Sequence, residues 1–123
     1  MDEPATIWRL LLRERLLAAR KDRDATRVSA LRSALGAIDN AETPDAEPLD
    51  LATSGPVAGS VAGLGAAEVP RRVLSDSAIR DLLRGEVDER LAAAEQISAG
   101  GQPDRAMALR AEAAVLADLL GGI

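Results

Sequence analysis

The side chains with the clearest capacity for chemistry are arginines gathered in one stretch of the chain. Residues 9–32 carry eight basic side chains against three acidic ones, although the whole chain has a formal net charge of −5. Clustered cations bind phosphate groups whatever the base sequence. This interpretation predicts nucleic-acid binding through five residues: Arg9, Arg13, Arg20, Lys21 and Arg23. The alternative is that they only solvate a helix face or pair with the acidic residues that dominate residues 74–123.

The carboxylates offer a second candidate chemistry, because Glu86, Glu89 and Glu112 could form an acid/base pair or an oxygen-ligand metal site. No Asp-rich loop or Glu-x-x-His motif surrounds them, and the chain has no histidine and no cysteine. Thiolate nucleophiles, Ser-His-Asp relays, zinc fingers and haem sites are thereby excluded. The sequence predicts no catalytic residue, no metal site and no cofactor, so we do not expect the chain to be an enzyme by itself.

These side chains must be positioned by helices. The 123 residues are 47% hydrophobic, with Trp8 as the only aromatic side chain, and alanine and leucine dominate the apolar residues. Such a composition favours helix over sheet. No apolar run is long enough to span a membrane, and the acidic N-terminus is unlike a signal peptide. We therefore expect one cytoplasmic domain with no membrane partner.

Apolar spacing predicts four helices in that domain: Thr6 to Arg20, Asp24 to Glu42, Ser75 or Asp76 to Ile97, and Pro103 to Leu120. Short turns join the first two and the last two, so each pair is predicted to be an antiparallel hairpin (6–42 and 74–120). Residues 43–72 are rich in proline and glycine and read as a flexible loop. The expected fold is an all-α four-helix bundle of two hairpins joined by this long loop.

Two of these helices carry predictions about which side faces inward. In the first helix, Trp8 and Leu12 belong to an inward stripe, whereas Ile7, Leu10 and Leu17 lie away from it. A helix that is apolar on two sides must bury both, so these three residues are candidates for self-association into a homo-oligomer. In the fourth helix the predicted inward positions are Met107, Ala111, Val115 and Leu119.

The turn and second helix also carry a family resemblance. The segment from Ala19 to Arg32 resembles the signature of the YqeY proteins, and the run from Ala37 to Glu42 resembles its continuation, Ala-Ile-x-Asn-x-Glu. YqeY proteins share a domain with the tail of GatB, a subunit of the tRNA-dependent amidotransferase. Leu74-Ser75-Asp76 is similar to the entry of the next family helix. The chain stops at Ile123, where family members continue into a smaller C-terminal helical subdomain.

The resemblance implies a non-catalytic module that assists tRNA-dependent amidation, with tRNA or a tRNA-processing complex as its partner. The associated activity, carbon-nitrogen ligation with glutamine as amido-N-donor, would belong to the relatives' complex. The resemblance also implies a half-buried ion-pair network among Arg27, Arg32, Glu86, Arg90 and Glu112 that sets how the helices cross. The alternative function is a protein-interaction or oligomerisation module that binds no nucleic acid.

Overall fold

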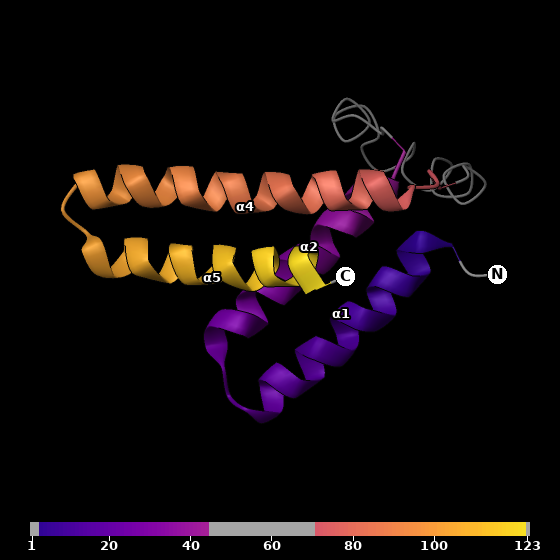
Figure 1. The fold of residues 1–123 in the computed structure, drawn as a ribbon, viewed down its shortest axis with the longest axis horizontal. Helices are drawn as coiled ribbons and strands as arrows, with labels where there is room; N and C mark the ends of the chain where they lie inside the picture. Colours follow the sequence, from indigo (N-terminus) through magenta and orange to yellow (C-terminus); the bar gives the residue numbers. More distant parts are fainter. Residues whose placement is uncertain (1–2, 45–70, 123) are drawn as a thin grey trace, which may run out of the picture.

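The computed structural model describes residues 3–44 and 71–122, and these residues contain four α-helices. The all-α class is therefore confirmed (Figure 1). Most of the expected proline- and glycine-rich loop, residues 45–70, lies outside the described residues. None of the described helices is long and apolar enough to cross a membrane.

The first hairpin consists of α1, Pro4–Lys21, and α2, Ala25–Glu42. Helix α1 begins two residues before the predicted cap Thr6, because Pro4 stands in its first turn, where a missing backbone N–H costs nothing. The turn uses Arg23 in the left-handed region, with φ of 55°. Asp24 caps α2 as predicted, since its side chain accepts a hydrogen bond from the backbone N–H of Arg27 at 3.1 Å.

The second hairpin consists of α4, Asp76–Ala99, and α5, Pro103–Gly122. Ser75 is the N-cap, because its hydroxyl oxygen accepts from the backbone N–H of Ala78 at 3.0 Å. Gly101 makes the turn between the helices at φ of 89°, a conformation that residues with a Cβ rarely adopt. Both helices end two residues later than predicted.

The two hairpins cross instead of running side by side along their whole length (Figure 1). Helices α1 and α2 pack on the half of the α4–α5 pair that holds the start of α4 and the end of α5. The other half, with the Gly100–Gly101 turn, extends beyond the first hairpin as a two-helix arm. The largest fully buried side chains are Leu12, Leu31, Ile38, Ile79, Leu83 and Leu116.

The prediction for α5 was wrong at two positions. Met107 is 64% exposed and Ala111 is exposed, whereas Ala106, Ala113 and Leu116 are buried. Helix α5 is apolar on several sides, so its sequence did not specify which side would be covered. Helix α5 packs most extensively against α4, and its buried positions include the small residues Ala106 and Ala113.

The described segments on either side of residues 45–70 meet at the end of α2. The backbone N–H of Arg72 donates to the carbonyl oxygen of Glu42 at 2.8 Å, and the Arg71 guanidinium donates to the Glu42 carboxylate at 3.1 Å. Arg9 of α1 also donates to that carboxylate. Glu42 is thus a buried charge whose carboxylate receives hydrogen bonds from two other chain segments, which is the condition for a buried carboxylate to remain ionised.

Candidate nucleic-acid interface

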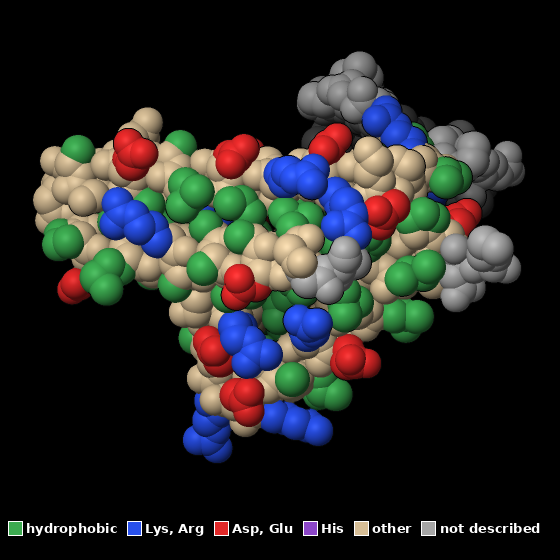
Figure 2. Space-filling model, viewed as in Figure 1, with side chains coloured by type: hydrophobic (Ala, Val, Ile, Leu, Met, Phe, Trp, Pro, Cys, Tyr) green, Lys and Arg blue, Asp and Glu red, His purple; other side chains and the backbone are tan. Residues whose placement is uncertain are grey.

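The basic residues predicted to bind nucleic acid divide into two groups in the structure. Arg13, Arg20, Lys21 and Arg23 are exposed, three of them at the end of the hairpin where α1 turns into α2. Figure 2 shows Lys and Arg side chains projecting from the lower end of the molecule, where this turn lies. The fifth residue, Arg9, lies about three turns before Arg20, toward the start of α1.

Arg9 is a correction to the predicted interface. Its guanidinium donates to Asp39 at 2.6 Å and also to Glu42, and its side chain is only 16% exposed. The hydrogen bond to Glu42, followed by that to Asp39, raises the pKa of Arg9, and the same contact with Arg9 lowers the pKa of Glu42. Arg9 therefore joins α1 to α2 and is not available to a phosphate group.

The acidic residues beside the turn do not neutralise the exposed cations. Asp22 receives a hydrogen bond from the Arg27 guanidinium at 3.3 Å, and Asp24 is occupied by the backbone N–H of the same residue. Arg27 thus draws both carboxylates to itself and leaves Arg20 and Arg23 without a counter-charge among the described residues.

Three acidic residues of α4, Asp76, Asp81 and Glu86, form ion pairs within their own helix. Arg80 pairs with Asp76 at 2.7 Å and Arg84 pairs with Asp81 at 3.0 Å, each within one turn of the same helix. No ion pair joins α4 to the basic residues of α1 in the described part of the chain. Six of the eight basic side chains of residues 9–32 make no hydrogen bond or ion pair with a described residue: Arg13, Arg15, Arg20, Lys21, Arg23 and Arg32.

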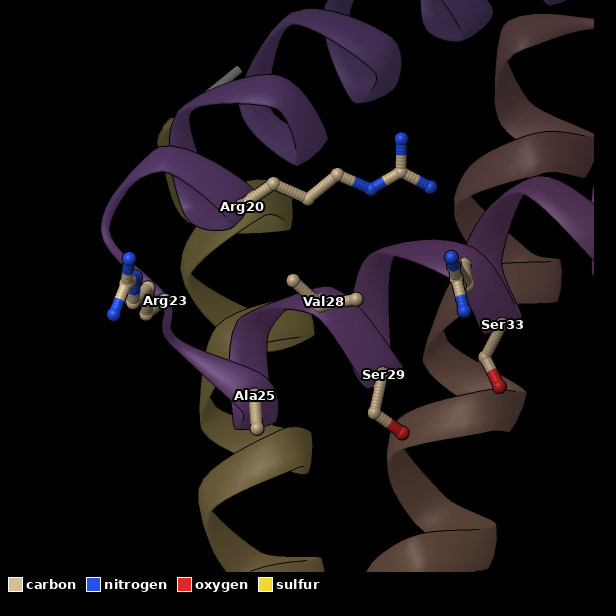
Figure 3. Close-up of a pocket in the computed structure, with 7 residues that line it drawn as sticks. Arg20, Arg23, Ala25, Val28, Ser29 and Ser33 are labelled. Atoms are coloured by element: carbon tan, nitrogen blue, oxygen red, sulfur yellow. The ribbon is translucent and has the colours of Figure 1, made fainter.

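Three of these six cations line one shallow groove with a volume of about 680 Å³. The groove is bordered by the end of α1, the turn and the first turns of α2, and its lining residues are Arg20, Arg23, Ala25, Val28, Ser29, Arg32 and Ser33. In Figure 3 the Arg20 side chain extends from α1 across the first turns of α2, above Val28. None of the lining residues is acidic, so the groove is a positively charged hollow with an apolar floor.

The predicted ion-pair residues come together only in part. The Arg90 guanidinium donates to Glu86 at 2.9 Å and to Glu112 at 3.1 Å, and Glu112 also accepts from the Ser29 hydroxyl at 3.1 Å. Burial disfavours the charge of Arg90, but the hydrogen bonds to both glutamates outweigh it and raise its pKa. This network joins α4, α5 and α2 where the arm leaves the rest of the fold.

The two remaining members lie elsewhere. Arg27 pairs with Asp22 beside the turn, and Arg32 lines the groove with no partner among the described residues. The three predicted self-association residues Ile7, Leu10 and Leu17 are 55%, 60% and 55% exposed. They lie away from the buried stripe of α1, to which Trp8, Leu12 and Leu16 belong.

Sequence reasoning missed several residues of this region. The groove hydroxyl of Ser33 and the apolar floor of Ala25 and Val28 could have been found by noting which side of α2 adjoins the end of α1. Arg32 was assigned to the ion-pair network, although it carries the third cation of the groove. Within residues 3–44 and 71–122 no cluster of three or more acidic residues is arranged to hold a metal ion.

Comparisons of the chain with models of protein families, with curated proteins and with solved structures find no match.

Proposed function

We propose that the chain is a non-catalytic helical module of the cytoplasm that binds the phosphate backbone of a structured RNA, with tRNA as the expected partner. The binding surface would be the turn end of the first hairpin. The observation that carries the proposal is that Arg20, Lys21 and Arg23 at this end, and Arg13 about two turns earlier on α1, are exposed and unpaired among the described residues. An exposed arginine without a counter-charge can exchange its counterions for phosphates.

The identity of the RNA comes from the resemblance to the YqeY proteins and the GatB tail. On that basis the module would assist tRNA-dependent amidation, with the chemistry carried out by other subunits. The arrangement of the site agrees with such a role, because guanidinium groups contact phosphates at any base sequence and recognise the shape of the folded RNA.

The test is RNA affinity as a function of salt. We expect fluorescence anisotropy with a labelled tRNA transcript to show affinity falling steeply from about 50 mM to about 200 mM salt. Replacing Arg13, Arg20 and Arg23 together by Glu should weaken binding by at least about tenfold and flatten the salt dependence.

A matched control replaces three arginines of the second hairpin, Arg84, Arg105 and Arg110, by Glu. Both variants change the net charge by the same amount, so a difference between them measures position and not overall charge. An RNA affinity that survives the hairpin variant, or falls equally in both, contradicts the proposed surface.

A second candidate function, self-association, is favoured by the exposed apolar stripe on α1. Ile7, Leu10 and Leu17 occupy it at helical spacing, with Glu3 before them and Lys21 after them. An antiparallel pair of α1 helices would bring Ile7 beside Leu17 of the second copy and Glu3 beside its Lys21. Opposite charges at both ends make a second copy of this chain the fitting occupant.

Light scattering tests this candidate. A dimer that Leu10→Lys and Leu17→Lys dissociate supports it, whereas Met107→Lys and Val73→Lys, at similarly exposed apolar positions, should leave the mass unchanged. A monomer at all concentrations excludes it.

A further inference from the structure

The groove at the turn end of the first hairpin has features that phosphate binding by itself does not need. Its volume of about 680 Å³ is within the range of sites for small organic molecules, roughly 300–1,000 Å³. A ligand that made only phosphate contacts would use the charged rim and leave the apolar floor of Ala25 and Val28 empty.

We propose that this groove holds one nucleotide, with its phosphate on the arginine rim and its base on the apolar floor. The rim provides the guanidinium groups of Arg23 and Arg32 for the phosphate, and guanidinium groups form strong charge-assisted hydrogen bonds with phosphate.

A nucleotide base stacks on a flat surface, which is often an aromatic ring. The only aromatic side chain of this sequence, Trp8, is buried and cannot serve. The planar guanidinium of an arginine is the usual alternative on which an unstacked base lies. Arg20 extends over Val28 in Figure 3 and has no partner among the described residues, so its guanidinium is free to cover a base placed on that floor. The hydroxyl of Ser33 is a further hydrogen-bonding group at the rim that is not already used.

The inference rests on the proposed function in one respect, which is that a bound RNA would provide the nucleotide from an unpaired position. Binding of a free nucleotide tests the groove without any RNA. The probe is adenosine monophosphate, compared with inorganic phosphate, ribose 5-phosphate and adenosine, added to the full chain with methyl-labelled alanine and valine.

We expect adenosine monophosphate to shift the methyl resonances of Ala25 and Val28, because the ring current of a base acts only at short range. It should bind at least about tenfold more tightly than phosphate or adenosine, since it uses both the rim and the floor. Arg32→Gln should weaken it by about tenfold through the loss of charge-assisted hydrogen bonds, and Arg110→Gln on the arm should not.

Ala25→Glu blocks the groove with a carboxylate while keeping the fold, because Ala25 is exposed and an acidic residue suits the first turn of a helix. Ala92→Glu, at an exposed position of α4, is its control. Only the first of these should abolish nucleotide binding.

The inference is overturned if the methyl resonances do not move, or if phosphate binds as well as the nucleotide. RNA binding without nucleotide binding would reject the groove and keep the proposed function. Nucleotide binding by a chain whose RNA affinity survives the triple reversal would reject that function and keep the groove.

Discussion

The indole Nε1 of Trp8 donates a hydrogen bond to Oδ1 of Asp76 over 2.8 Å, and this contact joins α1 to the first residue of α4. The Arg80 guanidinium, which pairs with Asp76, also lies 5.5 Å from the centre of the Trp8 ring. Trp8 therefore contributes to the crossing of the two hairpins through its N–H, its face and its buried area.

Trp8→Phe should lower the free energy of unfolding by about 1–2 kcal/mol, because it keeps an aromatic ring but removes the hydrogen bond to Asp76. Trp8→Ala should cost about 3–5 kcal/mol, since it also leaves a cavity. Urea denaturation followed by circular dichroism measures both. In a double-mutant cycle, Asp76→Asn should cost less in the Trp8→Phe background than in the original chain; equal costs would contradict the coupling.

Much of this arrangement could be predicted from the sequence. Helical spacing identified Trp8 and Leu12 as inward, and the caps Asp24 and Ser75 were readable as residue types that accept backbone hydrogen bonds. The crossing of the hairpins could not be predicted, because it depends on contacts between residues far apart in sequence, such as Trp8 and Asp76.

The candidate site shows the same division. The turn cations Arg20 and Arg23 stand out from local charge, whereas Arg9 looked equivalent to them in sequence. It differs only because Asp39 and Glu42 lie opposite it on α2. The local sequence pattern shows where a basic residue stands, but the tertiary structure determines whether an acidic residue pairs with it.

Glu42 should make the stability of the fold sensitive to acid. Its pKa is lowered in the folded chain, first by the hydrogen bond from Arg9, so the unfolded chain binds its proton more readily. The stability that Glu42 contributes is present above its ordinary pKa of 4.5 and is lost as the pH falls through the lower folded value. Glu42→Gln should cost about 2 kcal/mol at pH 7 and make the acid side of the stability curve less steep.

Thermal unfolding between about pH 3 and pH 7 measures this effect. Glu95→Gln is the matched control, because Glu95 is exposed and makes no hydrogen bond or ion pair with the described residues. A Glu42→Gln curve parallel to that of the original chain would show that another carboxylate dominates the acid response.

Two glycines should respond to alanine in opposite ways. Gly85 lies inside α4, and a Cβ there would meet no atom within 4 Å, so Gly85→Ala should raise the free energy of unfolding by about 0.5–1 kcal/mol. A Cβ at Gly101 would also meet no atom within 4 Å, but φ is 89° there. Gly101→Ala should therefore strain the turn and lower the free energy of unfolding by about 1 kcal/mol. Melting temperatures of the two variants give the comparison, and stabilisation by both would contradict the turn geometry.

Arg90 should be required for the stability of the fold, because it lies between two carboxylates that would otherwise repel each other. Its guanidinium lies between Glu86 of α4 and Glu112 of α5, and its side chain is only 12% exposed. Arg90→Met keeps most of the side-chain volume but leaves two half-buried negative charges without a partner. We expect a loss of about 2–4 kcal/mol at pH 7, since the removal of one member of a buried ion pair costs more than the pair contributes.

A second substitution that removes one of the two negative charges separates the effect of charge repulsion from the effect of lost side-chain packing. Glu112→Gln in the Arg90→Met background should recover much of the lost stability at pH 7, because it removes one of the two facing charges. Ser29→Ala serves as a control that removes a hydrogen bond from the same network without leaving a charge unpaired. A deficit in Arg90→Met that the second substitution does not reduce would mean that Arg90 acts through the packing of its side chain.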